Sequence, residues 1–149
     1  MNREHASLIK RIDASGKEVL AYVEALSQDQ LHNAPAPNEW SVHAVVAHLR
    51  DVEQHVFLKR IGRILSEEQP QVANFDQEQW NREHYSAMEP LDKIIAELRA
   101  ARAEELEILR KTSDEDWARW AVIPSTARSR SSGWRCTITV IRSNTCTKC

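Results

Sequence analysis

The sequence predicts an all-α fold, a bundle of long helices, from its composition and from the spacing of its apolar residues. Only three glycines occur in 149 residues, while Ala, Leu, Glu and Arg are frequent. These straight-chain residues and alanine lose little side-chain freedom in a helix. Apolar residues also recur every three or four positions along three long stretches, which is the period of one helix face. The length is that of one domain able to bury a core.

The first stretch predicts a long amphipathic helix over residues 4–26. Leu8, Ile12, Val19 and Val23 mark its apolar face. Gly16 lies in its middle and weakens the helix by about 1 kcal/mol relative to alanine. The segment that follows, LSQDQLHNAPAPNEW, contains two prolines and two asparagines. It predicts a loop, with one short helical turn after Ser27.

The second stretch predicts the most apolar helix, over residues 41–66, and we expect it to lie centrally. Ser41 precedes it and suits an N-cap, because its hydroxyl can accept from first-turn N–H groups. One face is marked by evenly spaced apolar residues, namely Val42, Val45, Leu49, Val52 and Val56.

The third stretch predicts a helix over residues 90–112. It follows a polar crossover that we expect to carry a short helix near 76–86. Pro90 suits the first helical turn, where its missing N–H is no loss. The sequence TSDEDW then predicts a further short helix.

The character of the chain changes after Trp120. No Asp or Glu follows Asp116, ten of the last 25 residues are Ser or Thr, and all three cysteines (136, 146 and 149) lie in this part. Helical periodicity disappears. We therefore divide the chain into a helical bundle over residues 1–120 and an atypical, irregular tail over residues 121–149.

Charge and hydropathy exclude several classes of protein. A formal net charge of −2 offers no electrostatic basis for binding nucleic acid. No apolar run approaches the roughly 18 residues that span a bilayer, so no membrane contact is expected. The start lacks the apolar segment of a secretory signal, which predicts a cytoplasmic protein with reduced thiols.

The candidate functional residue is His48 in the second helix. It lies between Val45 and Val52 in the sequence, so we expect its imidazole to point into the core, either hydrogen-bonded or bound to a metal. Asp51 follows one turn later, whereas His55 is about 10 Å further along the axis. The remaining histidines lie in polar surroundings and are expected at the surface: His5, His32, His43 and His84.

The segment NEWSVHAVVAHLRDVE resembles the second-helix signature of the DinB-like (YfiT-like) superfamily, in which Trp-Ser opens the helix and a His precedes an acidic pair. The match falls on Trp40, Ser41, His48, Asp51 and Glu53. The resemblance covers residues 1 to about 120. It implies an up-down-down-up four-helix bundle. It also implies zinc or nickel held by three histidines, with His48 as one ligand and Asp51 or Glu53 as its supporting carboxylate.

The resemblance further implies a metal-dependent enzyme, a thiol-dependent transferase or a hydrolase, acting on a small molecule or a low-molecular-weight thiol. The two other histidines of the family come from the fourth helix, but no histidine follows His84. We therefore expect the fourth helix to be missing and the chain to be inactive, with no metal bound. The alternative is a non-enzymatic helical interaction module. Three helices leave an apolar seam, which predicts instability or a homodimer.

The genetic code suggests an origin for the tail. When its possible codons are read from the third base of each, Cys136 into Thr137 can give only His or Tyr. Residues 120–133 can then be reread as GRHPEYGEVTLERM, and residues 134–148 as ALHYNRHSIEHLHQM, which contains two histidines four apart. We interpret the tail as a shifted reading frame that begins near residues 118–121. The rival interpretation, a zinc or redox site at CTKC, lacks a partner motif.

Overall fold

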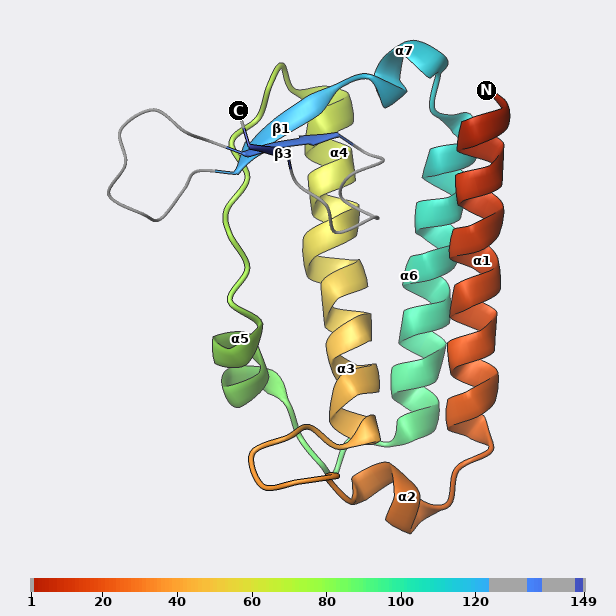
Figure 1. Ribbon diagram of the computed structural model, residues 1–149, viewed down its shortest axis with the longest axis vertical. Helices are drawn as coiled ribbons and strands as arrows, with labels where there is room; N and C mark the ends of the chain where they lie inside the picture. Colours follow the sequence, from red (N-terminus) through yellow and green to blue (C-terminus); the bar gives the residue numbers. More distant parts are fainter. Residues whose placement is uncertain (1, 124–133, 138–146, 149) are drawn as a thin grey trace.

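Three long helical columns stand side by side in the computed structural model, which describes residues 2–123, 134–137 and 147–148 (Figure 1). The prediction of an all-α bundle is confirmed. The columns are α1 (Arg3–Glu24), the continuous rod of α3 (Val42–Val52), η1 (Glu53–Phe57) and α4 (Leu58–Ser66), and α6 (Leu91–Lys111). Within the described part of the chain, none of the helices has a length and an apolarity that would let it cross a membrane.

Three short helices lie in the connections, where the sequence predicted helical turns. They are α2 (Gln28–His32), α5 (Gln77–His84) and α7 (Asp114–Trp117). Side-chain caps explain where they begin, since Ser27, Asp76 and Ser113 each accept from a first-turn N–H group. Ser41 caps α3 as predicted, whereas Pro90 stands just before the first residue of α6.

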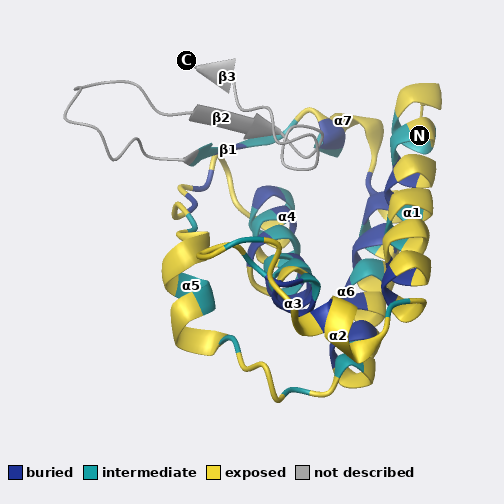
Figure 2. Ribbon diagram, turned by 60° about the horizontal axis from the view of Figure 1, so that its bottom comes forward, coloured by how far each residue is buried: buried dark blue, intermediate teal, exposed yellow. Residues whose placement is uncertain are grey.

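The core lies where α1 and α3 each pack against α6, so α6 is the shared wall of the bundle. Figure 2 shows buried residues on the inward sides of these helices. One apolar cluster joins the start of α1 to α4, the end of α6 and Trp117. A second joins the end of α1 to α2, α3 and the start of α6.

The buried face of α3 differs from the predicted one. Val45 is 41 % exposed, while His43, Val46, Ala47 and Arg50 are buried. Both sets have helical spacing, so apolar periodicity alone could not separate them. Polar partners from the crossover and α6 decide the outcome, because they satisfy His43 and Arg50 in the interior. The π-helical turn η1, which the sequence did not predict, then shifts the register of the rod.

Short strands follow α7, in contrast to the irregular structure predicted for the tail. The strands β1 (Trp120–Ile123), β2 (Trp134–Thr137) and β3 (Thr147–Lys148) form an antiparallel sheet in that order. Backbone bonds from Val72 to Val122 and from Val122 to Pro70 attach β1 to the crossover. The rest of the tail, including Cys146 and Cys149, lies outside the described residues. The boundary near residue 120 remains a prediction.

Candidate functional site around His48

His48 stands on α3 in an aromatic setting rather than in the core between the long helices. Its ring meets Trp40 edge-on at 5.0 Å between centroids and stacks on Phe75 at 6.3 Å. The side chain of His48 is partly buried. Its Nδ1 atom is enclosed and has no hydrogen-bond partner in the described part of the chain. The predicted orientation into the helix-packing core was therefore wrong, because the crossover supplies the cover.

The electrostatics favour a neutral imidazole at His48. Burial lowers its pKa below 6.5, while the nearby charges of Asp51 and Glu78 act in the opposite direction. A neutral ring retains one nitrogen lone pair, which is the form that binds a metal ion or accepts a proton. Among the described residues, Nδ1 of His48 is thus an enclosed polar atom without a hydrogen-bond partner, and such atoms call for an explanation.

The two carboxylates expected to support His48 are engaged elsewhere. Asp51 is buried, and its oxygens accept from Arg50 Nε at 2.8 Å and from Trp80 Nε1 at 2.9 Å. Glu53 is buried at the start of η1 and forms an ion pair with Arg102 of α6. Asp51 thus acts on His48 through its charge, and Glu53 belongs to the contact between the rod and α6.

The crossover contributes residues that sequence reasoning did not assign to the site. Phe75 covers His48, and Trp80 of α5 lies 5.5 Å from Phe75 and stacks on His84 at 3.9 Å. The hydrogen bond from Trp80 to Asp51 fastens α5 to α3. Large aromatic residues in an otherwise polar segment were the available signal, since an exposed Trp or Phe is uncommon without a contact.

His43 is nearly fully buried, so its predicted surface position was wrong. Its Nε2 lies 2.9 Å from the Glu89 carbonyl oxygen and therefore donates, which leaves Nδ1 to accept from the Tyr85 hydroxyl at 3.1 Å. Both polar ring atoms are satisfied, in contrast to Nδ1 of His48. His43 thereby joins the crossover to α3.

The histidines near the site do not converge on one point. His55 lies 5.0 Å from the Trp80 ring, and His84 stacks on Trp80, so the indole occupies the space next to both. Among the residues that the structure describes, no three His, Cys, Asp or Glu side chains are grouped to hold a metal ion.

Comparisons with known proteins agree with the helical fold. The structure matches YfiT from Bacillus subtilis, described as a probable metal-dependent hydrolase with an unusual four-helix bundle topology, with a TM-score of 0.78 and 20 % identity. The match covers 97 % of this chain and 82 % of that one. No curated protein matches the sequence. The sequence model of the DinB superfamily matches residues 11–135, and the chain therefore belongs to the DinB superfamily.

Proposed function

We propose that this chain derives from a metal-dependent DinB-family enzyme whose metal site it does not complete. The observation that carries the proposal is the enclosed, unpaired Nδ1 of His48, at the position where the sequence matches the family motif. The ancestral activity we infer is that of a thiol-dependent transferase or a hydrolase acting on a small molecule. Zinc or nickel would supply a Lewis acid that lowers the pKa of a bound thiol or water.

The residues present do not fit such an ion. A catalytic zinc site needs three protein ligands and an open position, whereas the described residues contain no group of three His, Cys, Asp or Glu side chains placed to hold one ion. We therefore derive no reaction step from the metal. We infer that this chain is inactive and that it binds no stoichiometric zinc or nickel through His48.

Metal content tests this inference directly. The purified chain, dialysed against zinc and then nickel, is analysed by inductively coupled plasma mass spectrometry beside the His48→Ala variant. We expect far less than one ion per chain and no difference between the two proteins. One tightly held ion per chain that is lost in His48→Ala would contradict the inference that this chain binds no metal through His48.

We further propose that the tail results from a frame change near residues 118–121. It accounts together for the loss of acidic residues, the clustered cysteines and the absence of histidine after His84. Sequencing the gene across codons 115–125 tests it. A chain rebuilt in the alternative frame should bind one ion per chain and lose it in His48→Ala, and an intact frame in the gene would overturn the explanation.

An interaction module without enzymatic activity is the second candidate. It is favoured by the partly exposed Val19 and Val45 on two different helices of the bundle. Replacing His48 by Leu in the rebuilt chain separates the candidates. In an enzyme this change abolishes metal uptake, whereas in a pure binding module it leaves binding unchanged and the stability equal or higher.

A further inference from the structure

We propose that residues 74–84, which include α5, form a lid that opens independently of the helical bundle and thereby exposes His48. This segment is the middle of the crossover, and it lies beside α3 and away from α1 and α6 (Figure 1). Long connections with little structure of their own frequently serve as lids over functional sites. That a small molecule is what the open lid admits rests on the proposed function, whereas the opening itself does not.

The lid covers His48 with an aromatic side chain. Phe75 stacks on the His48 ring with 6.3 Å between the ring centroids, and Trp80 lies 5.5 Å from Phe75. Trp40, which precedes α3 and is not part of the lid, meets the same imidazole edge-on at 5.0 Å. Because Phe75 moves with the lid and Trp40 does not, opening uncovers the side of the imidazole that Phe75 stacks on.

Both ends of the lid are fastened to the bundle. On one side, Arg60 of α4 donates a hydrogen bond to the Ala73 carbonyl oxygen at 2.7 Å. On the other side, the Tyr85 hydroxyl lies 3.1 Å from Nδ1 of the buried His43. Residues 74–84 are therefore a segment with fixed ends, which can move between two anchors without unfolding the bundle.

The attachment between these anchors is thin. None of the residues of α5 is buried, and Figure 2 shows most of this helix in the colour of exposed residues. Among the described residues, one hydrogen bond joins the lid to the bundle, from Trp80 Nε1 to Asp51 Oδ2 at 2.9 Å. The Trp80 ring also contacts His55 at 5.0 Å between centroids. A segment with so few buried contacts opens at a lower free energy than the whole fold.

The hydrogen bond from Trp80 to Asp51 acts as the latch of the lid. Asp51 is buried, and its other carboxylate oxygen accepts from Arg50 Nε at 2.8 Å. Arg50 in turn donates to Glu97 of α6 at 2.9 Å, so the acceptor of the latch is held by the bundle. When the lid opens, Asp51 keeps Arg50 as its ionic partner. Opening therefore leaves no unpaired buried charge, which limits its cost.

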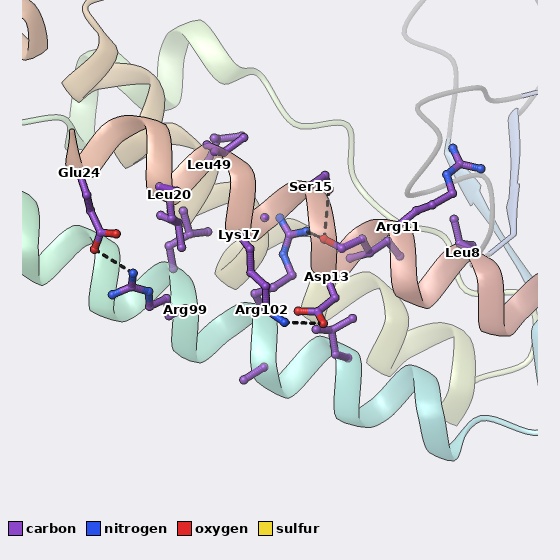
Figure 3. Close-up of a pocket in the computed structure, with 17 residues that line it drawn as sticks. Leu8, Arg11, Asp13, Ser15, Lys17, Leu20, Glu24, Leu49, Arg99 and Arg102 are labelled. Atoms are coloured by element: carbon purple, nitrogen blue, oxygen red, sulfur yellow. Dashed lines mark hydrogen bonds and ion pairs between the residues drawn. The ribbon is translucent and has the colours of Figure 1, made fainter. Parts of the chain in front are cut away.

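The long helices are joined much more firmly than the lid. Figure 3 shows Arg99 of α6 paired with Glu24 of α1 at 2.8 Å, and Arg102 of α6 reaching the Ile12 carbonyl oxygen. Buried apolar residues of α1 and α6 fill the clusters between them, whereas α5 contributes no buried residue. Separating α1 from α6 requires unfolding of the core, so these helices are the reference for any independent motion of the lid.

Hydrogen–deuterium exchange of the full chain, followed by NMR in the presence of EDTA, measures the opening. The Trp80 amide donates to the Asp76 carbonyl oxygen within the lid, so it exchanges only when α5 opens. We expect this amide to exchange roughly tenfold or more faster than hydrogen-bonded amides in the middle of α3 and α6. The measurement uses the wild-type chain and needs no substitution.

Reaction with diethyl pyrocarbonate, quantified by mass spectrometry at pH 7, measures the exposure of His48. Trp80→Phe keeps an aromatic ring but removes the N–H donor of the latch. The matched control is Gln79→Ala, because the Gln79 side chain is exposed and bonds to Glu83 of the same helix. We expect Trp80→Phe to raise the reaction rate of His48 at least fivefold and Gln79→Ala to leave it unchanged.

Two other histidines serve as internal references in the same samples. His32 is exposed and should react at one rate in all three proteins. His43 is buried with both ring nitrogens hydrogen-bonded, and it should remain protected in all three. Continued protection of His43 shows that the anchor at Tyr85 stays closed while the lid opens.

Three results would overturn the proposal: a Trp80 amide as protected as those of α6, equal reactivity of His48 in the wild type and Trp80→Phe, or simultaneous exposure of His43 and His48. The exchange result decides the question even if Trp80→Phe does not fold. Because EDTA is present throughout, failure of the lid is distinct from failure of the proposed function, which is tested by metal content.

Discussion

His43 illustrates how a single polar residue joins separate parts of this protein. It is buried on α3 and contacts Tyr85 and Glu89, which lie 42 and 46 positions later in the chain. Its imidazole therefore attaches the end of the crossover to the bundle. Because the imidazole is buried and its two partners are partly buried, loss of these hydrogen bonds leaves polar groups unsatisfied in a place that water reaches poorly.

The first prediction concerns this attachment. His43→Leu should lower the free energy of unfolding by about 2 kcal/mol, since the Tyr85 hydroxyl and the Glu89 carbonyl lose their partner. Urea unfolding followed by circular dichroism measures the change. His32→Leu, at an exposed position stacked on His43, is the control and should change stability by less than about 0.5 kcal/mol. Equal effects of the two substitutions would argue against a buried hydrogen-bonded role for His43.

Sequence patterns could propose His48 as a candidate site residue, but they could not predict the burial of His43. The motif around His48 is local, so the residue was recognised and its neighbour Trp40 with it. The partners of His43 are far away in the sequence, and so is Phe75, which covers His48. Which polar side chain is buried depends on such distant partners, and helical spacing carries no information about them.

At the scale of elements, two glycines weaken the helices without an obvious local need. Gly16 is in α1 and Gly62 is in α4, both with negative φ. A Cβ at Gly16 would make ordinary contact with Arg102 at 3.6 to 3.9 Å, and one at Gly62 would meet nothing within 4 Å.

The second prediction follows from these contacts. Gly16→Ala and Gly62→Ala should each raise the free energy of unfolding by about 0.5–1 kcal/mol, because alanine restricts the unfolded chain. Thermal and urea unfolding measure the gain. Gly62→Ala serves as the reference with open space around it. A loss of stability confined to Gly16→Ala would mean that Arg102 cannot move aside.

The third prediction concerns the joint between α3 and α6, where buried Arg50 donates to Glu89 and Glu97 at 2.8 and 2.9 Å. The hydrogen bond from Arg50 lowers the pKa of Glu89 below 4.5. The folded state therefore binds the proton less readily than the unfolded state. The stabilisation is complete above pH 4.5 and is lost as the pH falls through the lower, folded value.

Glu89→Gln tests this sign. The variant should be less stable than the wild type at pH 7, and the difference should shrink as the pH falls below 4.5, in urea unfolding performed across the acid range. Glu104→Gln on the exposed side of α6 is the control. A difference that grows towards acid pH would show that the Arg50 contact does not stabilise the charged form of Glu89.

The elements themselves were largely predictable, and their contacts were not. The three long helices follow from apolar periodicity, and the caps Ser27 and Ser41 from residue type. The π-helical turn at Glu53 has no sequence signal in the residues around it. Its register depends on the buried pairing of Glu53 with Arg102, which a pattern read along one helix does not contain.

On the scale of the whole molecule, the bundle is asymmetric, because α6 is packed on two sides while α1 and α3 each keep an open flank. The valines at 19 and 45 are about two-fifths exposed as a result. Fully covering a valine is worth about 1.5–3 kcal/mol, so any element that closes this flank gains from each partly exposed apolar side chain. A second copy of the chain is always available to do so.

The last prediction is therefore that the chain associates with itself through this flank when no other helix is present. Stable interfaces bury about 1,200–2,000 Å², so the association should include α1 and α3 together. Sedimentation equilibrium should show a dimer, and thermal unfolding should shift upward with protein concentration. The double variant Val19→Glu/Val45→Glu should be monomeric, while Tyr22→Glu retains the dimer. A wild-type monomer that unfolds sharply at a concentration-independent temperature would contradict this prediction. It would show that three helices form a stable fold and that the open flank does not need a partner.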